Sequence, residues 1–223
     1  MEKTKILVVK FANMIRDEEV PLFRGAVVNT MENPNVLFHN HNSDGSLRFD
    51  YPLIQYKCLD GVAVIVCVNK GTEVIGQFFA SCNFNVQIGN RQLYLQVNSV
   101  DGSQCEVQVV DDFIVYTIHK WLPLNQENFE TYIELDGLAD RCEMLEKKLI
   151  GNILSFAKGV GVSVDKEIVL KIKEVKGECV YKHKDVRMKG MDVVFGCNVL
   201  LPEYIGLGHG VSMGFGVIEK MKQ

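Results

Sequence analysis

Two histidines separated by one residue are the first feature of this sequence whose side chains could do chemistry. His39 and His41 follow the apolar residue Phe38 and stand in a segment rich in Asn, Asp, Gly and Ser. In an extended segment, residues two apart point to one side, so both imidazoles would lie within reach of one substrate. Such a pair is compatible with metal ligation, with general acid–base catalysis, or with exposed polarity alone.

Metal ligation is the least supported of these three uses. The other three histidines lie far along the chain, and no carboxylate cluster accompanies the pair. Two histidines can cleave RNA without a metal: the neutral one deprotonates the ribose 2′-OH, and the protonated one donates to the departing 5′ oxygen. Each role is worth a factor of about 100 to 10,000 in rate. We therefore expect no metal and no cofactor, while acid–base catalysis and exposed polarity both stay open.

A glycine-rich segment near the end of the sequence is the second feature. Residues 206–216 contain five glycines. Glycine adopts positive φ and lets the backbone approach a ligand, so successive N–H groups can hold an anion such as phosphate. The segment lacks the Gly-Lys-Ser/Thr of a Walker loop and the spacing of a dinucleotide fingerprint, which disfavours nucleotide sites. A phosphate-binding loop and a tight irregular connection between two strands both remain open.

A short basic run precedes this segment. Its cations are Lys182, Lys184, Arg187 and Lys189, on residues that read as a pair of strands. Lysines on an exposed strand protect a sheet edge, or they contact an RNA backbone. The chain as a whole carries a formal charge of −4 with a pI near 5.8, which argues against a nonspecific polyanion binder. Any RNA surface must therefore be local.

Composition places the chain among folded globular proteins. It has 223 residues, of which 47% are hydrophobic and 23% charged, so disorder and coiled coil are excluded. No apolar run is long enough to cross a bilayer, and the apolar segment at the N-terminus is too short for a signal peptide. Seven cysteines occur without any C-x-x-C pair, which predicts reduced thiols. We expect a cytoplasmic protein with no membrane partner.

The hydrophobic pattern of the first half predicts alternating strands and helices. The expected elements are a strand over 4–11, a helix that follows Asp17 and buries Phe23, Ala26 and Val27, strands over 47–59 and 62–68 joined by a hairpin turn at Asp60-Gly61, a short helix over 71–82, and short strands within 84–118 that break at Gly89-Asn90 and Asp101-Gly102.

The pattern changes from period two to period 3.6 around residues 121–125, and we place a domain boundary there. The elements expected afterwards are a long helix over 128–158 and strands over 168–175, 179–188 and 193–200. The prediction is therefore an α+β fold with two tandem ferredoxin-like domains, residues 1–122 and residues 123–223, the second ending in the glycine-rich loop.

Residues 198–216, with their glycine-rich end, resemble the C-terminal signature of the CRISPR-associated RNA-processing endoribonucleases, which belong to the repeat-associated mysterious protein superfamily. Residues 51–57 and 149–156 are also similar to that family. Together these segments resemble the subgroup with separate N-terminal and C-terminal ferredoxin-like domains.

The resemblance implies metal-independent cleavage of CRISPR precursor repeat RNA, leaving a 2′,3′-cyclic phosphate and a 5′-hydroxyl. The positions that match the family's catalytic histidines are His39 and His41, and which of them is the base stays open. Arg48, Tyr51 and Lys57 follow them in the sequence and are expected to stabilise the charge of the phosphorane. The expected RNA-binding residues are Lys182, Lys184, Arg187, Lys189, Gly206, Gly208, His209, Gly210, Ser212, Gly214 and Gly216.

The glycine-rich segment departs from the resemblance at two positions. Similar loops often carry Lys and Arg where this chain has His209 and Met213, so two phosphate-binding cations are missing. A non-catalytic protein that binds repeat RNA or assembles a complex is therefore the alternative function, and a small-anion-binding protein is a third. Partnership with other CRISPR-associated proteins and a homo-oligomer both stay open.

Overall fold

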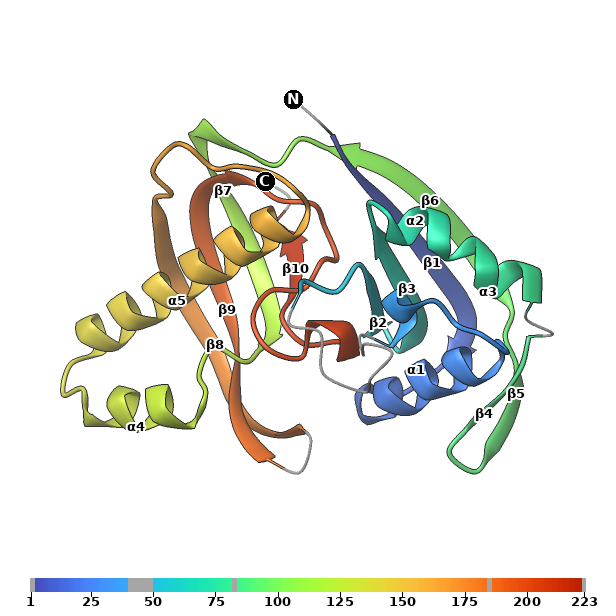
Figure 1. The fold of residues 1–223 in the computed structure, drawn as a ribbon. Helices are drawn as coiled ribbons and strands as arrows, with labels where there is room; N and C mark the ends of the chain where they lie inside the picture. Colours follow the sequence, from blue (N-terminus) through green and yellow to red (C-terminus); the bar gives the residue numbers. More distant parts are fainter. Residues whose placement is uncertain (1–2, 40–49, 82–83, 184–185, 222–223) are drawn as a thin grey trace. The chain divides into compact units, whose positions relative to one another are not determined.

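The computed structural model describes residues 3–39, 50–81, 84–183 and 186–221 (Figure 1). Contacts between residues divide the chain into two compact units. The first holds Met1–Cys105 together with Ser212–Gly214, and the second holds Glu106–Val211 together with Phe215–Gln223. Each unit contains one four-stranded sheet.

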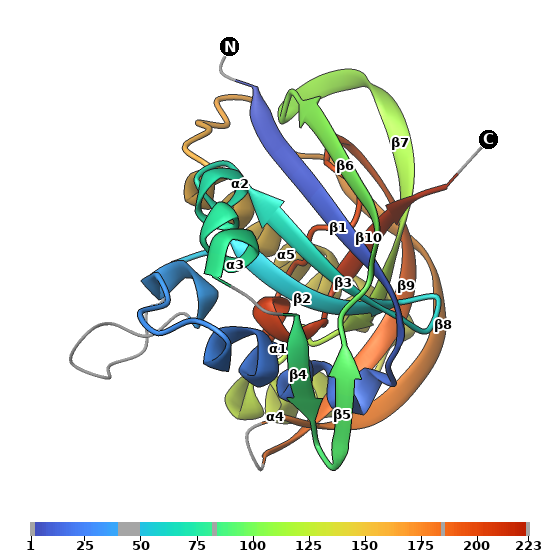
Figure 2. The same ribbon diagram turned by 90° about the vertical axis from the view of Figure 1, so that its right-hand side faces the viewer.

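The first unit has the ferredoxin-like arrangement that the sequence predicts. Its sheet has the order β2-β3-β1-β6 with every neighbouring pair antiparallel, and helices follow the first and third of these strands along the chain. Its elements are β1 (Thr4–Met14), η1 (Asp17–Glu19), α1 (Val20–Asn29), η2 (Val36–Phe38), β2 (Ile54–Leu59), β3 (Val62–Val68), α2 (Gly71–Val74), α3 (Gly76–Ser81), β4 (Asn85–Ile88), β5 (Arg91–Tyr94) and β6 (Val97–Cys105). The β4–β5 ribbon lies beyond the end of the four-stranded sheet (Figure 2).

The predicted hairpin between β2 and β3 is confirmed. Its two turn residues, Asp60 and Gly61, have φ values of 51° and 79°, and Leu59 pairs with Val62 across the turn. Two successive positive φ values give a turn whose twist matches that of the strands, which is why an Asp-Gly pair favours it. The strand before the turn begins at Ile54, and residues 47–49 of the predicted strand lie outside the described residues.

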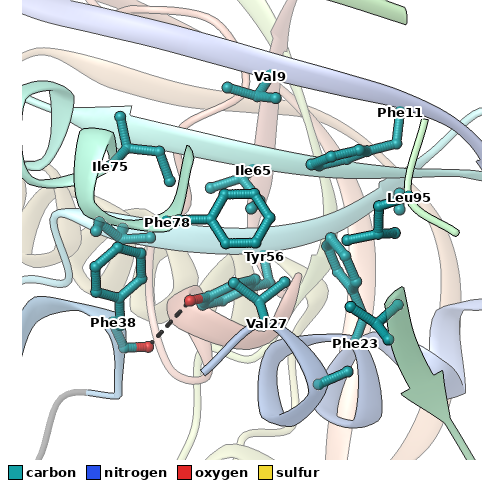
Figure 3. Close-up of a cluster of buried hydrophobic side chains, with 14 of the residues drawn as sticks. Val9, Phe11, Phe23, Val27, Phe38, Tyr56, Ile65, Ile75, Phe78 and Leu95 are labelled. Atoms are coloured by element: carbon teal, nitrogen blue, oxygen red, sulfur yellow. Dashed lines mark hydrogen bonds between the residues drawn. The ribbon is translucent and has the colours of Figure 1, made fainter. Parts of the chain in front are cut away.

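The core of the first unit lies between α1 and one face of the sheet (Figure 3). Phe23 of α1 makes edge-to-face contacts with Phe11 and with Tyr56, each with ring centroids 5.8 Å apart. Ala26 and Val27 are buried on the same helix face, as the sequence predicts. Edge-to-face aromatic pairs add to the hydrophobic gain of burial, so they fix α1 against β1 and β2.

Two predictions for the first unit are wrong in detail. The predicted helix over 71–82 is two short helices that break at Ile75, next to Gly76, a residue with poor helix propensity. The expected break at Asp101-Gly102 does not occur, because β6 runs through both residues and pairs them with Val8 and Leu7 of β1. Pairing along the whole ladder overrides the local turn preference.

The second unit repeats the same strand order. Its sheet is β10-β7-β9-β8, again antiparallel throughout, and α5 lies across the sheet (Figure 1). Its elements are β7 (Gln108–Trp121), α4 (Gln126–Glu134), α5 (Leu138–Gly159), β8 (Leu170–His183), β9 (Val186–Leu200) and β10 (Val217–Lys220). Between β9 and β10 the chain forms the short turn η3 (Val211–Met213), of which Ser212 and Met213 are grouped with the first unit. The glycine-rich segment therefore occupies the place of the second helix of a ferredoxin-like domain.

The sequence placed the domain boundary at residue 122, whereas the contacts divide the chain at Cys105 and Glu106. The two boundaries differ by the length of β7. Its period-two pattern resembles that of the strands before it, so the sequence assigns it to the first domain. β7 pairs with β9 and β10 and is the first strand of the second unit.

Further along, the predicted single helix over 128–158 is wrong, because α4 and α5 are separated at Leu135 and Gly137, whose backbones are extended. The three predicted strands are two long ones, β8 and β9. Among the described residues, no helix is long and apolar enough to span a membrane.

The cysteines that the structure describes with their side chains are free thiols, as predicted: Cys58, Cys67, Cys105, Cys142 and Cys197. Burial raises the pKa of the Cys67 thiol and raises that of Cys197 to about 11. Because the thiolate is the reactive form, both groups are inert at neutral pH.

Candidate functional site

His39 lies at the end of the one-turn helix η2. Its N–H donates to the carbonyl of Val36 at 3.3 Å, and Asn35 caps the start of the turn by accepting from the N–H of Leu37 at 3.0 Å. Leu37 and Phe38 are buried in the core of the first unit, while His39 is half-buried. The turn therefore places the half-buried His39 directly after the two buried residues Leu37 and Phe38. His41 and Arg48 lie outside the described residues.

Two side chains from the core elements bind the last carbonyls of this turn. The hydroxyl of Tyr56 on β2 donates to the carbonyl of Phe38 at 3.2 Å (Figure 3), and the guanidinium of Arg24 on α1 donates to the carbonyl of His39. Burial lowers the pKa of Arg24 and raises the pKa of Tyr56, so the phenol keeps its proton at any physiological pH. Sequence analysis missed both residues.

The remaining two residues proposed as charge stabilisers belong to the segment that leads into β2 and to β2 itself. Tyr51 is half-buried, and its hydroxyl accepts from the side-chain amide of Gln55 at 2.9 Å. Lys57 is fully buried and pairs with Val64 of β3 in the sheet. Both belong to the same unit as His39, and contact with a reacting phosphate stays a prediction for each.

The glycine-rich segment is a tightly folded connection between β9 and β10. The N–H of Leu207 donates to the carbonyl of Gly216 at 2.9 Å, and the N–H of Gly216 donates to that of Lys120 at 3.2 Å. The N–H of His209 binds the carbonyl of Leu122. These donors are used inside the protein, so they do not serve as the phosphate-binding groups that the sequence suggested for such a loop.

Close packing accounts for several of the glycines. Gly208 has φ +89°, and a Cβ there would lie 2.9 Å from the indole nitrogen of Trp121. Gly216 has φ +65°, and a Cβ there would overlap the carbonyl oxygen of Leu207. L-residues rarely adopt such φ values, and neither neighbour is the free end of a flexible chain. Both positions therefore require glycine for the fold itself.

His209 is the most exposed residue of this segment, although part of its ring is covered near α5. Partial burial of the ring, together with the ammonium of Lys148, lowers the pKa of His209. Lys148 donates to the side-chain oxygen of Asn128 at 2.7 Å, and the indole of Trp121 donates to Asn152 at 2.9 Å. Lys148 and Asn152 are four residues apart on α5, so they lie on one face of the helix. Ser212 is half-buried in η3.

The basic run lies on the β8–β9 hairpin. The register pairs Lys182 with Arg187 and Val180 with Lys189. Directly opposite positions of an antiparallel ladder share one face, so the two strands present these positions together. The ammonium of Lys189 lies 5.4 Å from the ring centroid of Tyr132, a cation–π contact that ties β9 to α4. Lys184 lies outside the described residues.

These observations define a protein of two tandem ferredoxin-like units, with a histidine-bearing turn in the first and a glycine-rich connection in the second. Models of known families agree with both halves. Residues 2–106 match the Cas6b N-terminal domain, and residues 108–221 match the Cas6b C-terminal domain. The chain belongs to the Cas6b family.

Known proteins with similar chains include two solved structures and one sequence relative. A structure described as a crystal structure of Cas6b is 27% identical with a TM-score of 0.90, covering 99% of this chain and 100% of that one. A structure of a CRISPR RNA processing endoribonuclease Cas6b is 24% identical with a TM-score of 0.76 and the same coverage. An uncharacterised protein of Methanocaldococcus jannaschii is 34% identical over 119 residues, which are 53% of this chain and 80% of the relative.

The packing around Gly216 predicts a large loss of stability on substitution. Gly216→Ala forces the segment to move, because the new methyl group overlaps a backbone carbonyl, and should cost on the order of 3 kcal/mol. The matched control is Gly161→Ala, where φ is +80° but no atom lies within 4 Å, so only backbone strain of about 1 kcal/mol is expected. Chemical denaturation of both variants measures the difference. Equal small losses would contradict the packing.

Proposed function

We propose that this protein is a metal-independent endoribonuclease that cuts CRISPR precursor repeat RNA by internal transesterification. Membership of the Cas6b family supports the substrate class, and one of the similar structures is a CRISPR RNA processing endoribonuclease. The observation that carries the proposal is the placement of His39. This half-buried residue ends a turn whose last two carbonyls accept hydrogen bonds from Tyr56 and Arg24.

In the proposed reaction, His39 and His41 act as general base and general acid, with the assignment between them left open. The base takes the proton of the ribose 2′-OH, and the 2′ oxygen forms a new bond to phosphorus. The bond from phosphorus to the 5′ oxygen breaks, and the acid gives its proton to that oxygen. The products are a 2′,3′-cyclic phosphate and a 5′-hydroxyl, and no water is consumed.

We assign charge stabilisation of the phosphorane to Arg48, Tyr51 and Lys57, which follow the histidines along the chain. The chemistry needs the attacking oxygen, the phosphorus and the leaving oxygen in line, and positioning of this kind is worth several kcal/mol. The catalytic groups must therefore be held before the RNA arrives, which the hydrogen bonds around His39 support.

RNA binding is assigned to the β8–β9 hairpin and to the glycine-rich segment. The basic positions Lys182, Lys184, Arg187 and Lys189 would contact phosphates, and the side chains of His209 and Ser212 would contribute from the glycine-rich segment. Because several N–H groups of that segment bind carbonyls within the protein, side chains rather than backbone supply the binding energy in this proposal.

A non-catalytic repeat-RNA-binding protein of the same fold is the second candidate function. The observation that favours it is the presence of His209 and Met213 at positions where similar loops carry cations. One gel that measures binding and cleavage of the cognate repeat RNA separates the two functions, since tight binding without product would favour this alternative.

Replacement of both histidines tests the proposed catalysis. We expect the double substitution His39→Ala with His41→Ala to lower single-turnover cleavage of repeat RNA from the host's own array at least about 1,000-fold, because both proton transfers are lost. His119→Ala is the matched control, since that imidazole lies in the second unit between Asp192 and Glu219. Undiminished cutting by the double variant would remove the histidines from the reaction.

The transesterification mechanism predicts the effects of chelation and of the substrate's 2′ group. Cutting should persist in excess EDTA, because this mechanism needs no metal-bound water. Replacing the scissile 2′-OH by hydrogen should abolish it, because the nucleophile is then missing. Product analysis on gels checks both. Loss of activity in EDTA that zinc or manganese restores would identify a metallohydrolase instead.

The basic hairpin predicts salt-dependent binding. Lys182→Ala with Lys184→Ala should weaken RNA binding and lower the slope of log affinity against log salt by about 0.7 for each lost contact with single-stranded RNA. Lys147→Ala with Lys158→Ala on α5 is the control for loss of two positive charges. Binding isotherms at four salt concentrations measure the slopes. If the slope is unchanged both in Lys182→Ala with Lys184→Ala and in Arg187→Ala with Lys189→Ala, the basic hairpin does not bind the RNA.

A further inference from the structure

We propose that Arg24 and Tyr56 are positioning residues for His39, holding the peptide that carries its imidazole by two consecutive carbonyl groups. We call this pair of donors the carbonyl clamp. The inference rests on the proposed function, since it gives the clamp a catalytic purpose, but the clamp itself is a feature of the free protein.

The end of η2 needs hydrogen-bond donors from outside the turn. A three-residue 3₁₀ turn has few internal hydrogen bonds, and the carbonyls at its end have no partner within the helix. The carbonyl of Phe38 lies beside a fully buried side chain, and a buried carbonyl without a donor costs about 1–3 kcal/mol. Donors from elsewhere in the unit are therefore required.

The two donors come from elements that pack into the core of the first unit. Tyr56 is fully buried on β2, where its ring contacts Phe23, and its hydroxyl reaches the carbonyl of Phe38 (Figure 3). Arg24 is the neighbour of Phe23 on α1 and reaches the carbonyl of His39. A guanidinium makes a charge-assisted bond that is stronger than one between neutral groups.

The start of the turn is also hydrogen-bonded to the rest of the first unit, through the side chain of Gln77. The side-chain oxygen of Gln77 accepts from the N–H of Asn35 at 3.0 Å, and its nitrogen donates to the carbonyl of Asn33 at 2.6 Å. Both ends of the turn are therefore hydrogen-bonded to other parts of the first unit.

This fixed position matters for the proposed reaction. Acid–base groups must stay within about 0.5 Å of the productive geometry, and a misplacement of about 1 Å costs on the order of 100-fold in rate. Arg24 is bound to the carbonyl of His39, so we assign it an action through His39 rather than on the RNA.

The test combines a measurement on the free protein with one on the reaction. Hydrogen–deuterium exchange of the backbone N–H groups of Phe38 and His39 should speed up by about tenfold in Arg24→Gln and in Tyr56→Phe. Single-turnover cleavage at saturating RNA should slow by about 10- to 100-fold, while the Kd for the repeat RNA stays within about twofold.

Arg24→Lys keeps a cationic donor and should recover part of the rate. Arg91→Gln, which breaks an ion pair with Glu19 in the same unit, is the matched control and should change neither measurement.

A double-mutant cycle separates positioning from direct contact and from general destabilisation. In the His39→Ala background, Arg24→Gln should have no further effect on residual cleavage, because its role passes through the missing imidazole. Additive losses would overturn the assignment of Arg24 as a positioning residue.

Unchanged exchange at Phe38 and His39 in both clamp variants would show that no clamp exists. If the wild-type protein does not cut repeat RNA, the proposed function fails and the positioning role with it, while the exchange measurement still decides whether the clamp holds the turn.

Discussion

The carbonyl groups of Phe38 and His39 need hydrogen-bond donors at the place where a one-turn helix ends on an apolar core, and the candidate site depends on this requirement. The donors are Tyr56 and Arg24, so the site exists only if α1 and β2 pack together. The aromatic contacts of Phe23 and the β2–β3 hairpin secure that packing. In this way the core of the first unit fixes a polar turn at its edge.

The second unit uses the same strand order but makes its last connection differently. In the first unit, the connection to the final strand of the sheet contains α2, α3 and the β4–β5 ribbon, whereas in the second a glycine-rich segment makes this connection. That segment passes so close to Trp121 and to its own backbone at Leu207 that side chains are excluded at Gly208 and Gly216. Its glycines therefore have a structural reason that is independent of any ligand, and several of its N–H groups are already bonded.

Local chemistry made parts of this structure predictable from sequence. Asp60-Gly61 specifies its own turn, and the spacing of Phe23, Ala26 and Val27 specifies a helix face. The errors lie where the local sequence pattern does not decide the structure. At residues 101–102 a turn-like pair is held in a strand by the ladder to β1, and at Leu135–Gly137 an apolar period continues across a break between helices.

The site was predictable only in part. The histidine pair stands out by its spacing, and His39 lies at a turn in the described structure. The clamp leaves no such sign, because Arg24 and Tyr56 are 15 and 18 residues from the carbonyls that they bind and resemble any other helix and strand residues. Only the folded unit brings them together.

The central claim is that the turn ending at His39 is folded in advance and delivers its imidazole to the scissile phosphate. A structure of the protein bound to repeat RNA with a 2′-deoxy group at the cut site tests this most directly. We expect the imidazole of His39 to lie within hydrogen-bond distance of the scissile 2′ position or the departing 5′ oxygen, with both clamp bonds intact. A scissile phosphate held away from His39, or bound only after the clamp has opened, would contradict it.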